Sequence, residues 1–241
     1  MIVCLDSGNS RIKWGVHAGG AWLEQGAAGH DEAALAALVR RWPRPERLLL
    51  ANVAGPAAAA RIRQNLGPWA PLLQEARSER ERAGVVNHYR HPERLGVDRW
   101  CALIGARGRT RSPCLVVMAG TATTIDTLDD DGHFRGGLIL PGSDLMRESL
   151  ARDTAQLPLG RGQWAALPEC TEDAIASGIL EAQAGAVERA FARLASPSAR
   201  CLVSGGNAGA LLAHLGIPCA EAPNLPLEGL LRLALEPEDQ T

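Results

Sequence analysis

The stretch Ile2-Val-Cys-Leu-Asp-Ser-Gly-Asn-Ser-Arg-Ile-Lys13 decides how the first part of this chain folds. Its apolar start, residues 2–5, predicts a buried strand. Residues 7–10 predict a tight turn, because glycine and asparagine tolerate positive φ and small side chains let backbone N–H groups approach a ligand. Ile12 and Trp14 alternate with polar neighbours, which predicts a strand returning from that turn.

The chemistry of this loop suits phosphate groups. Asp6, at the end of the first strand, can hold a hydrated Mg²⁺ ion, and Ser10 with the backbone can donate hydrogen bonds to phosphate oxygens. Lys13 adds a positive charge and is the only lysine in the chain. The alternative is a surface hairpin in which the aspartate and asparagine only stabilise the turn.

Composition narrows the class of protein. A chain of 241 residues can bury a real core, and its formal charge of −2 gives no electrostatic reason to expect nucleic acid as a partner. Six scattered cysteines, without zinc or redox spacing, predict buried thiols in a reducing compartment. Without a leader pattern or a long apolar run, no membrane association is expected, and the predicted location is the cytoplasm.

The first half alternates predicted strands and helices. The interruption at 108–113 then marks the best domain boundary, so we predict domains at 1–110 and 111–241. The predicted strands after the opening hairpin are 21–25, 47–53 and 72–76, and the predicted helices are Glu32 to Arg41, Pro56 to Leu66 and a helix that reaches about Arg107.

The second half repeats the opening pattern. A strand at 115–118, a tight turn at 119–121, a return strand at 123–128 and a third strand at 136–140 indicate a duplicated unit. Beyond them we predict helices at 143–152 and 172–194, a strand at 201–204, a glycine turn at 205–209 and a helix to about Leu215.

A duplicated unit of this kind places its two turns facing each other across a cleft, which suits a nucleoside triphosphate. The loop Asp6–Lys13 would take one side of the phosphates, Gly120-Thr121 the other, and Gly205-Gly206 the adenosine side. No Gly-Lys-Ser/Thr occurs, so a P-loop enzyme is excluded. The run 160–165 matches G-x-G-x-x-A but follows no predicted strand, and it is discounted.

Several motifs stand out by their order and spacing. They are Asp6-x-Gly-Asn-Ser10, Gly96-Val-Asp-Arg99, Gly120-Thr-Ala-Thr-Thr-Ile-Asp126, Gly136-Gly-x-Ile-x-Pro-Gly142, and Thr171 ahead of Ser177-Gly178. Together they resemble the type III pantothenate kinases, of the superfamily that includes acetate kinase, sugar kinases, heat-shock proteins and actin, and the resemblance covers nearly the whole chain. It implies an α/β fold of two ribonuclease-H-like (actin-like ATPase) domains with the nucleotide cleft between them, a homodimer, and transfer of the ATP γ-phosphoryl group to the 4′-hydroxyl of pantothenate, the first step of coenzyme A synthesis.

The resemblance also assigns residues. Asp98 matches the proton acceptor, and Arg99 can hold it ionised or clamp phosphoryl charge. Substrate-binding positions are Tyr89, Gly96, Val97, Asp98, Arg99 and Thr171; nucleotide-binding positions are Asp6, Ser7, Gly8, Asn9, Ser10, Arg11, Ile12, Lys13 and Thr121, with Asp6 as the Mg²⁺ ligand. From the residues alone, Asp98 and Thr171 can equally be helix caps, and Tyr89 a partly buried aromatic.

One position departs from the family pattern. Members usually place an aspartate two residues before the Gly-Thr of the second turn, where it helps to hold potassium or ammonium, and here that residue is Met118. A thioether is a poor ligand for a hard cation. Either the cation site is lost, or backbone carbonyls and another side chain rebuild it.

Two other functions remain open on sequence grounds. Some proteins that resemble this family are described as Bvg accessory factors, so the chain can be a transcriptional helper with a relict kinase site. The chain can also be a kinase of the same superfamily for another small acceptor. The intact Asp6, Lys13, Asp98, Arg99 and Thr121 argue against a dead site.

Overall fold

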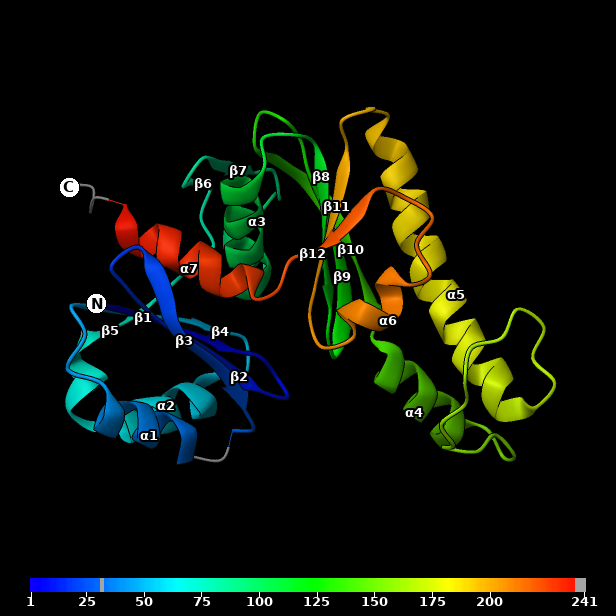
Figure 1. The fold of residues 1–241 in the computed structure, drawn as a ribbon, viewed down its shortest axis with the longest axis horizontal. Coiled ribbons are helices and arrows are strands. Elements are labelled where there is room, and N and C mark those ends of the chain that lie inside the picture. The colour runs from blue at the N-terminus through cyan, green and yellow to red at the C-terminus, as the bar shows by residue number, and fades with distance from the viewer. Residues whose placement is uncertain (31–32, 237–241) are drawn as a thin grey trace. The chain divides into compact units, whose positions relative to one another are not determined.

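The computed structural model describes residues 1–30 and 33–236, and the chain divides into two units (Figure 1). The first unit combines Met1–Arg111 with the segment that starts at Asn224, and the second is Ser112–Pro223. The predicted boundary at residue 110 differs from this grouping in one respect, because the last helix, α7 (Leu225–Leu235), packs within the first unit. Glu32, where a helix was predicted to start, lies outside the described residues.

A five-stranded sheet forms the centre of the first unit, in the order β3-β2-β1-β4-β5. β1 pairs antiparallel with β2 and parallel with β4, so the predicted opening hairpin is confirmed and β1 lies in the middle of the sheet. The strands are β1 (Ile2–Ser7), β2 (Ile12–Ala18), β3 (Ala21–Ala28), β4 (Arg47–Asn52) and β5 (Leu73–Glu75).

Helices cover both faces of this sheet, and the alternation along β1 explains why (Figure 1). Val3 and Leu5 pack with α1 (Ala33–Arg41) and α2 (Pro56–Leu66). Ile2 and Cys4, which point to the other face, pack with α7 and with Cys101 of α3 (Val97–Arg109). A strand that is buried on both sides reads as a continuous apolar run, as residues 2–5 do.

Short elements connect α2 to α3. The charged run at 77–82 finishes in a two-residue strand that pairs with the next strand as a small hairpin. These elements are the 3-10 helix η1 (Gly67–Leu72), β6 (Glu81–Arg82), β7 (Val85–Asn87) and the 3-10 helix η2 (Pro92–Arg94).

Two glycines let α3 and α7 approach closely. A Cβ atom on Gly229 would lie 1.8 Å from the Cys101 carbonyl oxygen, and one on Gly105 would lie 2.4 Å from the Leu225 carbonyl oxygen. Only a residue without a side chain fits at either position. At the end of α3, the Arg109 guanidinium Nε donates to Glu228 Oε2 at 2.7 Å.

The second unit is built on strands in the order β12-β11-β8-β9-β10. The predicted strand-turn-strand-strand repeat is confirmed here as β8, β9 and β10, and α5 with α6 covers one face of the sheet. The elements are β8 (Cys114–Ala119), β9 (Ala122–Leu128), β10 (His133–Pro141), α4 (Ser143–Asp153), α5 (Thr171–Phe191), the 3-10 helix η3 (Ala192–Leu194), β11 (Arg200–Ser204), α6 (Ala208–Leu212) and β12 (Cys219–Glu221).

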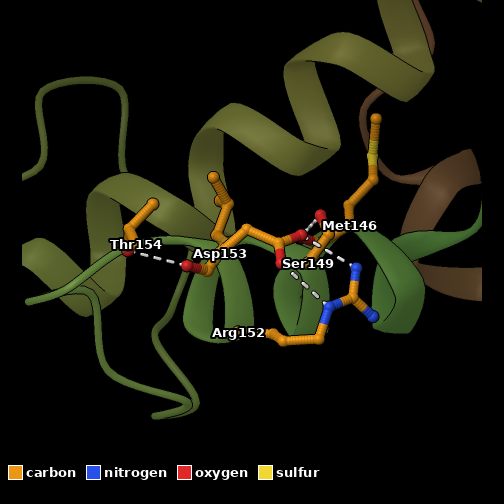
Figure 2. A network of polar contacts seen from close by, with 6 residues as sticks. Met146, Ser149, Arg152, Asp153 and Thr154 are labelled. Atoms are coloured by element: carbon orange, nitrogen blue, oxygen red, sulfur yellow. Dashed lines mark hydrogen bonds and ion pairs between the residues drawn. The ribbon is translucent and has the colours of Figure 1, made fainter.

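Local polar contacts lie along the C-terminal half of α4, and the Thr154 contact closes its end (Figure 2). The Thr154 hydroxyl donates to the Leu150 carbonyl oxygen at 2.7 Å, and the Ser149 hydroxyl donates to the Met146 carbonyl oxygen at 2.8 Å. The Arg152–Asp153 ion pair, at 2.8 Å, is exposed, so it adds little to stability. Within the described ranges, no helix combines the length and the apolar character that crossing a membrane requires.

The α3–α7 contact yields a stability prediction. Gly229→Ala places a methyl group against the Cys101 carbonyl, so the two helices must separate. We expect the free energy of unfolding to fall by about 2–3 kcal/mol and the melting temperature by roughly 5–10 °C. The matched control is Gly185→Ala on α5, where a Cβ meets nothing within 4 Å and helix propensity favours alanine by about 0.5–1 kcal/mol. Equal melting temperatures for the two variants would contradict the prediction.

Candidate active site

The β1–β2 hairpin carries the first group of polar side chains. Asp6 on β1 lies opposite Lys13 on β2 in the strand register. The turn closes where the Gly8 N–H donates to the Arg11 carbonyl oxygen at 3.0 Å, and residues 9–11 are exposed. The result is an accessible small-residue turn with a carboxyl group and an ammonium group at its base, which suits a phosphate chain and its counter-ion.

Asp6 is held in an unusual electrostatic state. Its side chain is buried, and its Oδ1 has no hydrogen-bond partner among the described residues. Burial, followed by the charge of Asp98, raises the pKa of Asp6 to about 7, while Lys13 acts to lower it. A divalent cation would satisfy the orphaned oxygen and keep the carboxylate ionised.

The residues present fit a Mg²⁺ ion that is held mainly by its nucleotide. Across residues 1–30 and 33–236, no group of three or more His, Cys, Asp or Glu side chains is arranged to hold a metal. Mg²⁺ commonly binds through one or two carboxylates together with substrate phosphates, without a closed protein cage. Asp6 supplies a carboxylate of that kind.

Asp98 lies in the first turn of α3, where its Oδ1 accepts a hydrogen bond from the Arg99 backbone N–H at 2.8 Å. The N-cap residue is Gly96, so the alternative in which Asp98 caps the helix is wrong. A Cβ atom on Gly96 would lie 2.7 Å from Asp98 Oδ1, so glycine leaves room for the carboxyl group. Burial raises the pKa of Asp98, and the Arg99 N–H and guanidinium oppose that shift.

The two carboxyl groups belong to one site. Asp98 acts on the pKa of Asp6, and both charges, after burial, raise the pKa of the Cys101 thiol one helical turn further along α3. Cys101 is fully buried and stays protonated, so it offers no thiolate nucleophile. The structure thus brings Asp98 together with Asp6 and Lys13 of the opening hairpin, which lie far from it in sequence.

Arg99 and Tyr89 form a second pair within the first unit. Arg99 Nη1 donates to the Tyr89 hydroxyl at 3.2 Å, and its guanidinium carbon lies 5.8 Å from the centre of the Tyr89 ring. The Tyr89 backbone N–H donates to Asn87 Oδ1 at 3.0 Å, which fixes the loop that carries it. A buried guanidinium in contact with a phenol is suited to bind an anion such as a carboxylate.

The turn between β8 and β9 is the corresponding feature of the second unit. The Gly142 N–H donates to the Thr121 carbonyl oxygen at 2.9 Å, and a Cβ on Gly142 would lie 2.2 Å from the Gly120 carbonyl oxygen. From the other side, a Cβ on Gly205 would lie 2.3 Å from the Ala119 carbonyl oxygen. Two glycines from different segments therefore pack directly on the backbone of this turn.

A cavity of about 350 Å³ lies in the second unit beside this turn. It is bounded by α4, α5, α6 and residues 160–162, and Ala119 and Asn207 line it next to the turn. The Asn207 N–H donates to the Ala119 carbonyl oxygen at 3.1 Å. Ile175 and Ile179 contribute apolar wall, so the cavity combines apolar surface with a few polar groups, as small-molecule sites do.

Met118 and Thr171 also lie in the second unit. Met118 occupies β8, opposite Thr124 of β9 and Ser204 of β11, so no carboxylate stands at that position. Thr171 is exposed at the start of α5, where Cys170 is the N-cap and makes no capping hydrogen bond through its side chain. The alternative in which Thr171 is the helix cap is therefore wrong.

A sequence model of the type III pantothenate kinases matches residues 2–193. This chain belongs to that family. A relative from Dechloromonas aromatica (strain RCB) with this name is 60% identical over 237 residues, which cover 98% of this chain and 100% of the relative. Another from Aromatoleum aromaticum (strain DSM 19018 / LMG 30748 / EbN1) is 51% identical over 238 residues and 98% of each chain.

Solved structures that resemble this member of the family share its fold. One is a Campylobacter jejuni protein described as a Baf family transcriptional activator, with a TM-score of 0.60, 17% identity and 96% of each chain covered. Another is a Sinorhizobium meliloti protein described as a 2-dehydro-3-deoxygalactonokinase, with a TM-score of 0.61, 17% identity and coverage of 97% of this chain and 98% of that one. The predicted α/β, actin-like fold with two sheets is confirmed.

One polar residue of the second unit, Gln183, was not identified from the sequence. Gln183 is buried and lines the cavity beside the β8–β9 turn. It lies on the apolar stripe of α5 formed by Ile175, Ile179 and Val187, with a spacing of four residues throughout. A glutamine within an otherwise apolar helical stripe was the signal that could have identified it.

The state of Asp6 predicts opposite effects of one substitution on stability and activity. The folded protein holds the Asp6 proton up to about pH 7, whereas an ordinary aspartate loses it near 3.8, so the destabilisation from this residue grows as the pH rises from about 4 and levels off above about 7. Asp6→Asn, measured without Mg²⁺, should raise the free energy of unfolding by up to about 4 kcal/mol at pH 8 and by almost nothing at pH 3.5. Its turnover should fall.

Thermal unfolding of wild type and Asp6→Asn across this pH range checks the prediction. Asp131→Asn in the exposed β9–β10 turn is the control and should show no such pH-dependent gain. A stability difference between Asp6→Asn and wild type that does not change with pH would contradict the assigned pKa shift.

Proposed function

We propose that this chain transfers the γ-phosphoryl group of ATP to the 4′-hydroxyl of pantothenate, the first step of coenzyme A biosynthesis. The observation that carries the proposal is the carboxyl group of Asp98, half-buried, raised in pKa, and held in the first turn of α3 beside both Asp6 and Arg99. Membership of the type III pantothenate kinase family supports pantothenate as the acceptor.

In the proposed reaction, the 4′-hydroxyl oxygen attacks the γ-phosphorus, and the bond to the β–γ bridging oxygen breaks, releasing ADP. Asp98 accepts the hydroxyl proton as the new bond forms. A primary alcohol is a weak nucleophile, and a well-placed base typically contributes about 10²–10⁴ in rate. The raised pKa of Asp98 makes it a better proton acceptor than an exposed aspartate.

Pantothenate binding is proposed for the group around α3. The Arg99 guanidinium, held by Tyr89, would pair with the pantothenate carboxylate, because guanidinium and carboxylate bind each other through paired hydrogen bonds. Gly96 and Val97 would line the same site at the start of the helix. Thr171 of α5 is proposed as a further pantothenate-binding residue.

ATP binding is proposed for the two turns, so that residues 6–13 and Thr121 would each bind phosphate oxygens. Mg²⁺, when bound with the nucleotide, supplies neutralisation of phosphate charge, and Asp6 would hold it. Lys13 would contribute a further positive charge. The cavity beside the β8–β9 turn, next to Gly205, would take the nucleoside end.

We also propose that the protein acts as a homodimer in the cytoplasm, without nucleic acid or membrane partners. Exposed Leu138 and Ile139 on β10 and Leu145 on α4 support association of two copies. The six cysteines are all free, which supports a reducing compartment, and the formal charge of −2 gives nucleic acid little to bind.

The first test compares wild type with Asp98→Asn. Purified protein is supplied with MgATP and pantothenate, and 4′-phosphopantothenate is measured directly. The amide cannot accept the proton, so kcat should fall by about 10²–10⁴ while binding of MgATP is preserved. Asp131→Asn is again the control and should keep wild-type turnover.

Failure of wild type to form the product would contradict the proposed function. It would favour a transcriptional accessory role with a relict kinase site, or a different small acceptor. Full activity of Asp98→Asn would leave the kinase intact but remove Asp98 from the role of base.

A second prediction concerns monovalent cations. Because Met118 offers a thioether where family members usually place an aspartate, turnover should change less than about twofold when potassium or ammonium replaces a large inert cation at fixed ionic strength. Met118→Asp should acquire a clear potassium dependence. A many-fold potassium stimulation of wild type would indicate instead that backbone carbonyls and another side chain rebuild the cation site.

A further inference from the structure

The amide of Gln183 is held in one orientation. Its Nε2 donates to the Pro141 carbonyl oxygen at 2.7 Å and lies 3.4 Å from Met146 Sδ. Figure 2 shows the Met146 thioether extending away from the Arg152–Asp153 pair at the end of α4. Only the nitrogen can donate to a carbonyl, so rotating the amide by 180° would set two acceptors against each other.

The residue that Gln183 contacts, Pro141, directly precedes the residue that contacts the β8–β9 turn. Pro141 ends β10, and the next residue, Gly142, donates to the Thr121 carbonyl oxygen at 2.9 Å. Because a Cβ on Gly142 would lie 2.2 Å from the Gly120 carbonyl oxygen, the two backbones touch without intervening side chains. A shift of Pro141 is therefore transmitted to the turn rather than absorbed.

We propose that Gln183 is a positioning residue for the Gly120–Thr121 turn, which it holds through Pro141 and Gly142. The inference rests on the proposed function in one respect, namely that this turn receives ATP phosphates. Gln183 touches neither reacting group, so its effect is on nucleotide binding and not on the proton transfer at Asp98. It also lines the cavity proposed for the nucleoside, so its effect through the turn must be measured with a ligand that carries the phosphates alone.

The hydrogen bond from Gln183 to Pro141 is significant because Gln183 is buried. Gln183 is 2% exposed, and its Oε1 has no hydrogen-bond partner among the described residues. An amide with one unsatisfied oxygen is a costly occupant of an apolar helical stripe, where leucine or methionine would fill the same space without that penalty. The hydrogen bond to Pro141 is the interaction that such an apolar residue would lose.

The test measures the affinity of Gln183→Met for MgATP and for magnesium tripolyphosphate, which lacks the nucleoside, by titration calorimetry in the absence of pantothenate. Methionine keeps the length of the side chain and removes the donor, so both dissociation constants should rise roughly tenfold. A rise for MgATP alone would place the effect in the nucleoside pocket and overturn the positioning role. The KM for pantothenate should stay within about twofold of wild type. Gln74→Met, the same substitution at an exposed glutamine of the first unit, is the control and should bind MgATP normally.

A second variant separates positioning from general loss of stability. In Gln183→Glu, burial should favour the protonated carboxyl, whose O–H can donate to the Pro141 carbonyl, whereas the ionised form cannot. The dissociation constant, divided by that of wild type at the same pH, should therefore be near one at low pH and rise through a single titration as the pH increases. Gln183→Met should give a pH-independent ratio.

The outcomes are distinct. A dissociation constant for Gln183→Met within twofold of wild type, or a pH-independent ratio for Gln183→Glu, overturns the positioning role. A lower melting temperature with unchanged MgATP affinity also overturns it, because the contact is then only structural. Binding of MgATP by wild type without phosphorylation of pantothenate contradicts the proposed function and leaves this inference standing.

Discussion

The constraint on which the first unit depends is the confinement of two carboxyl groups that repel each other, Asp6 buried and Asp98 half-buried. Asp6 lies on the central strand β1, and Asp98 lies in the first turn of α3, so neither can move away without disrupting a strand or a helix. Low exposure and like charge both oppose ionisation of Asp6, which Lys13 only partly offsets. Such an arrangement reduces the stability of the folded protein and becomes favourable when a cation binds, as expected of a site selected for activity.

In both units, backbone segments pack directly on one another at glycine residues. Where α3 meets α7, and where Gly142 and Gly205 meet the β8–β9 turn, glycine allows peptide groups to touch directly. A side chain at any of these glycines would meet a backbone carbonyl oxygen and push the two segments apart. Beside the β8–β9 turn, the Gln183 amide donates to the carbonyl oxygen of Pro141, the residue that precedes Gly142.

Local signals explain what the sequence predicted well. The β1–β2 hairpin and the β8–β9–β10 repeat follow from turn residues set between apolar runs, and most of the predicted helices follow from their apolar spacing. The place of α7 in the first unit could not be predicted, because it depends on contacts between residues more than a hundred positions apart. The pKa of Asp6 and the target of Gln183 depend likewise on neighbours from other elements. Asp6 and Lys13 were proposed from the chemistry of the opening loop and Asp98 from the family resemblance, and neither gave a reason to single out Gln183.

Because α7 packs within the first unit, that unit cannot be completed until α7 has been synthesised. During synthesis, the sheet of the first unit can gain α1, α2 and α3 early, yet Ile2, Cys4 and Cys101 stay without their covering helix until residue 235 has left the ribosome. The second unit, whose contacts are all made by then, can fold before the first is complete. The apolar face of the N-terminal sheet that α7 covers thus stays partly uncovered throughout translation of the second unit.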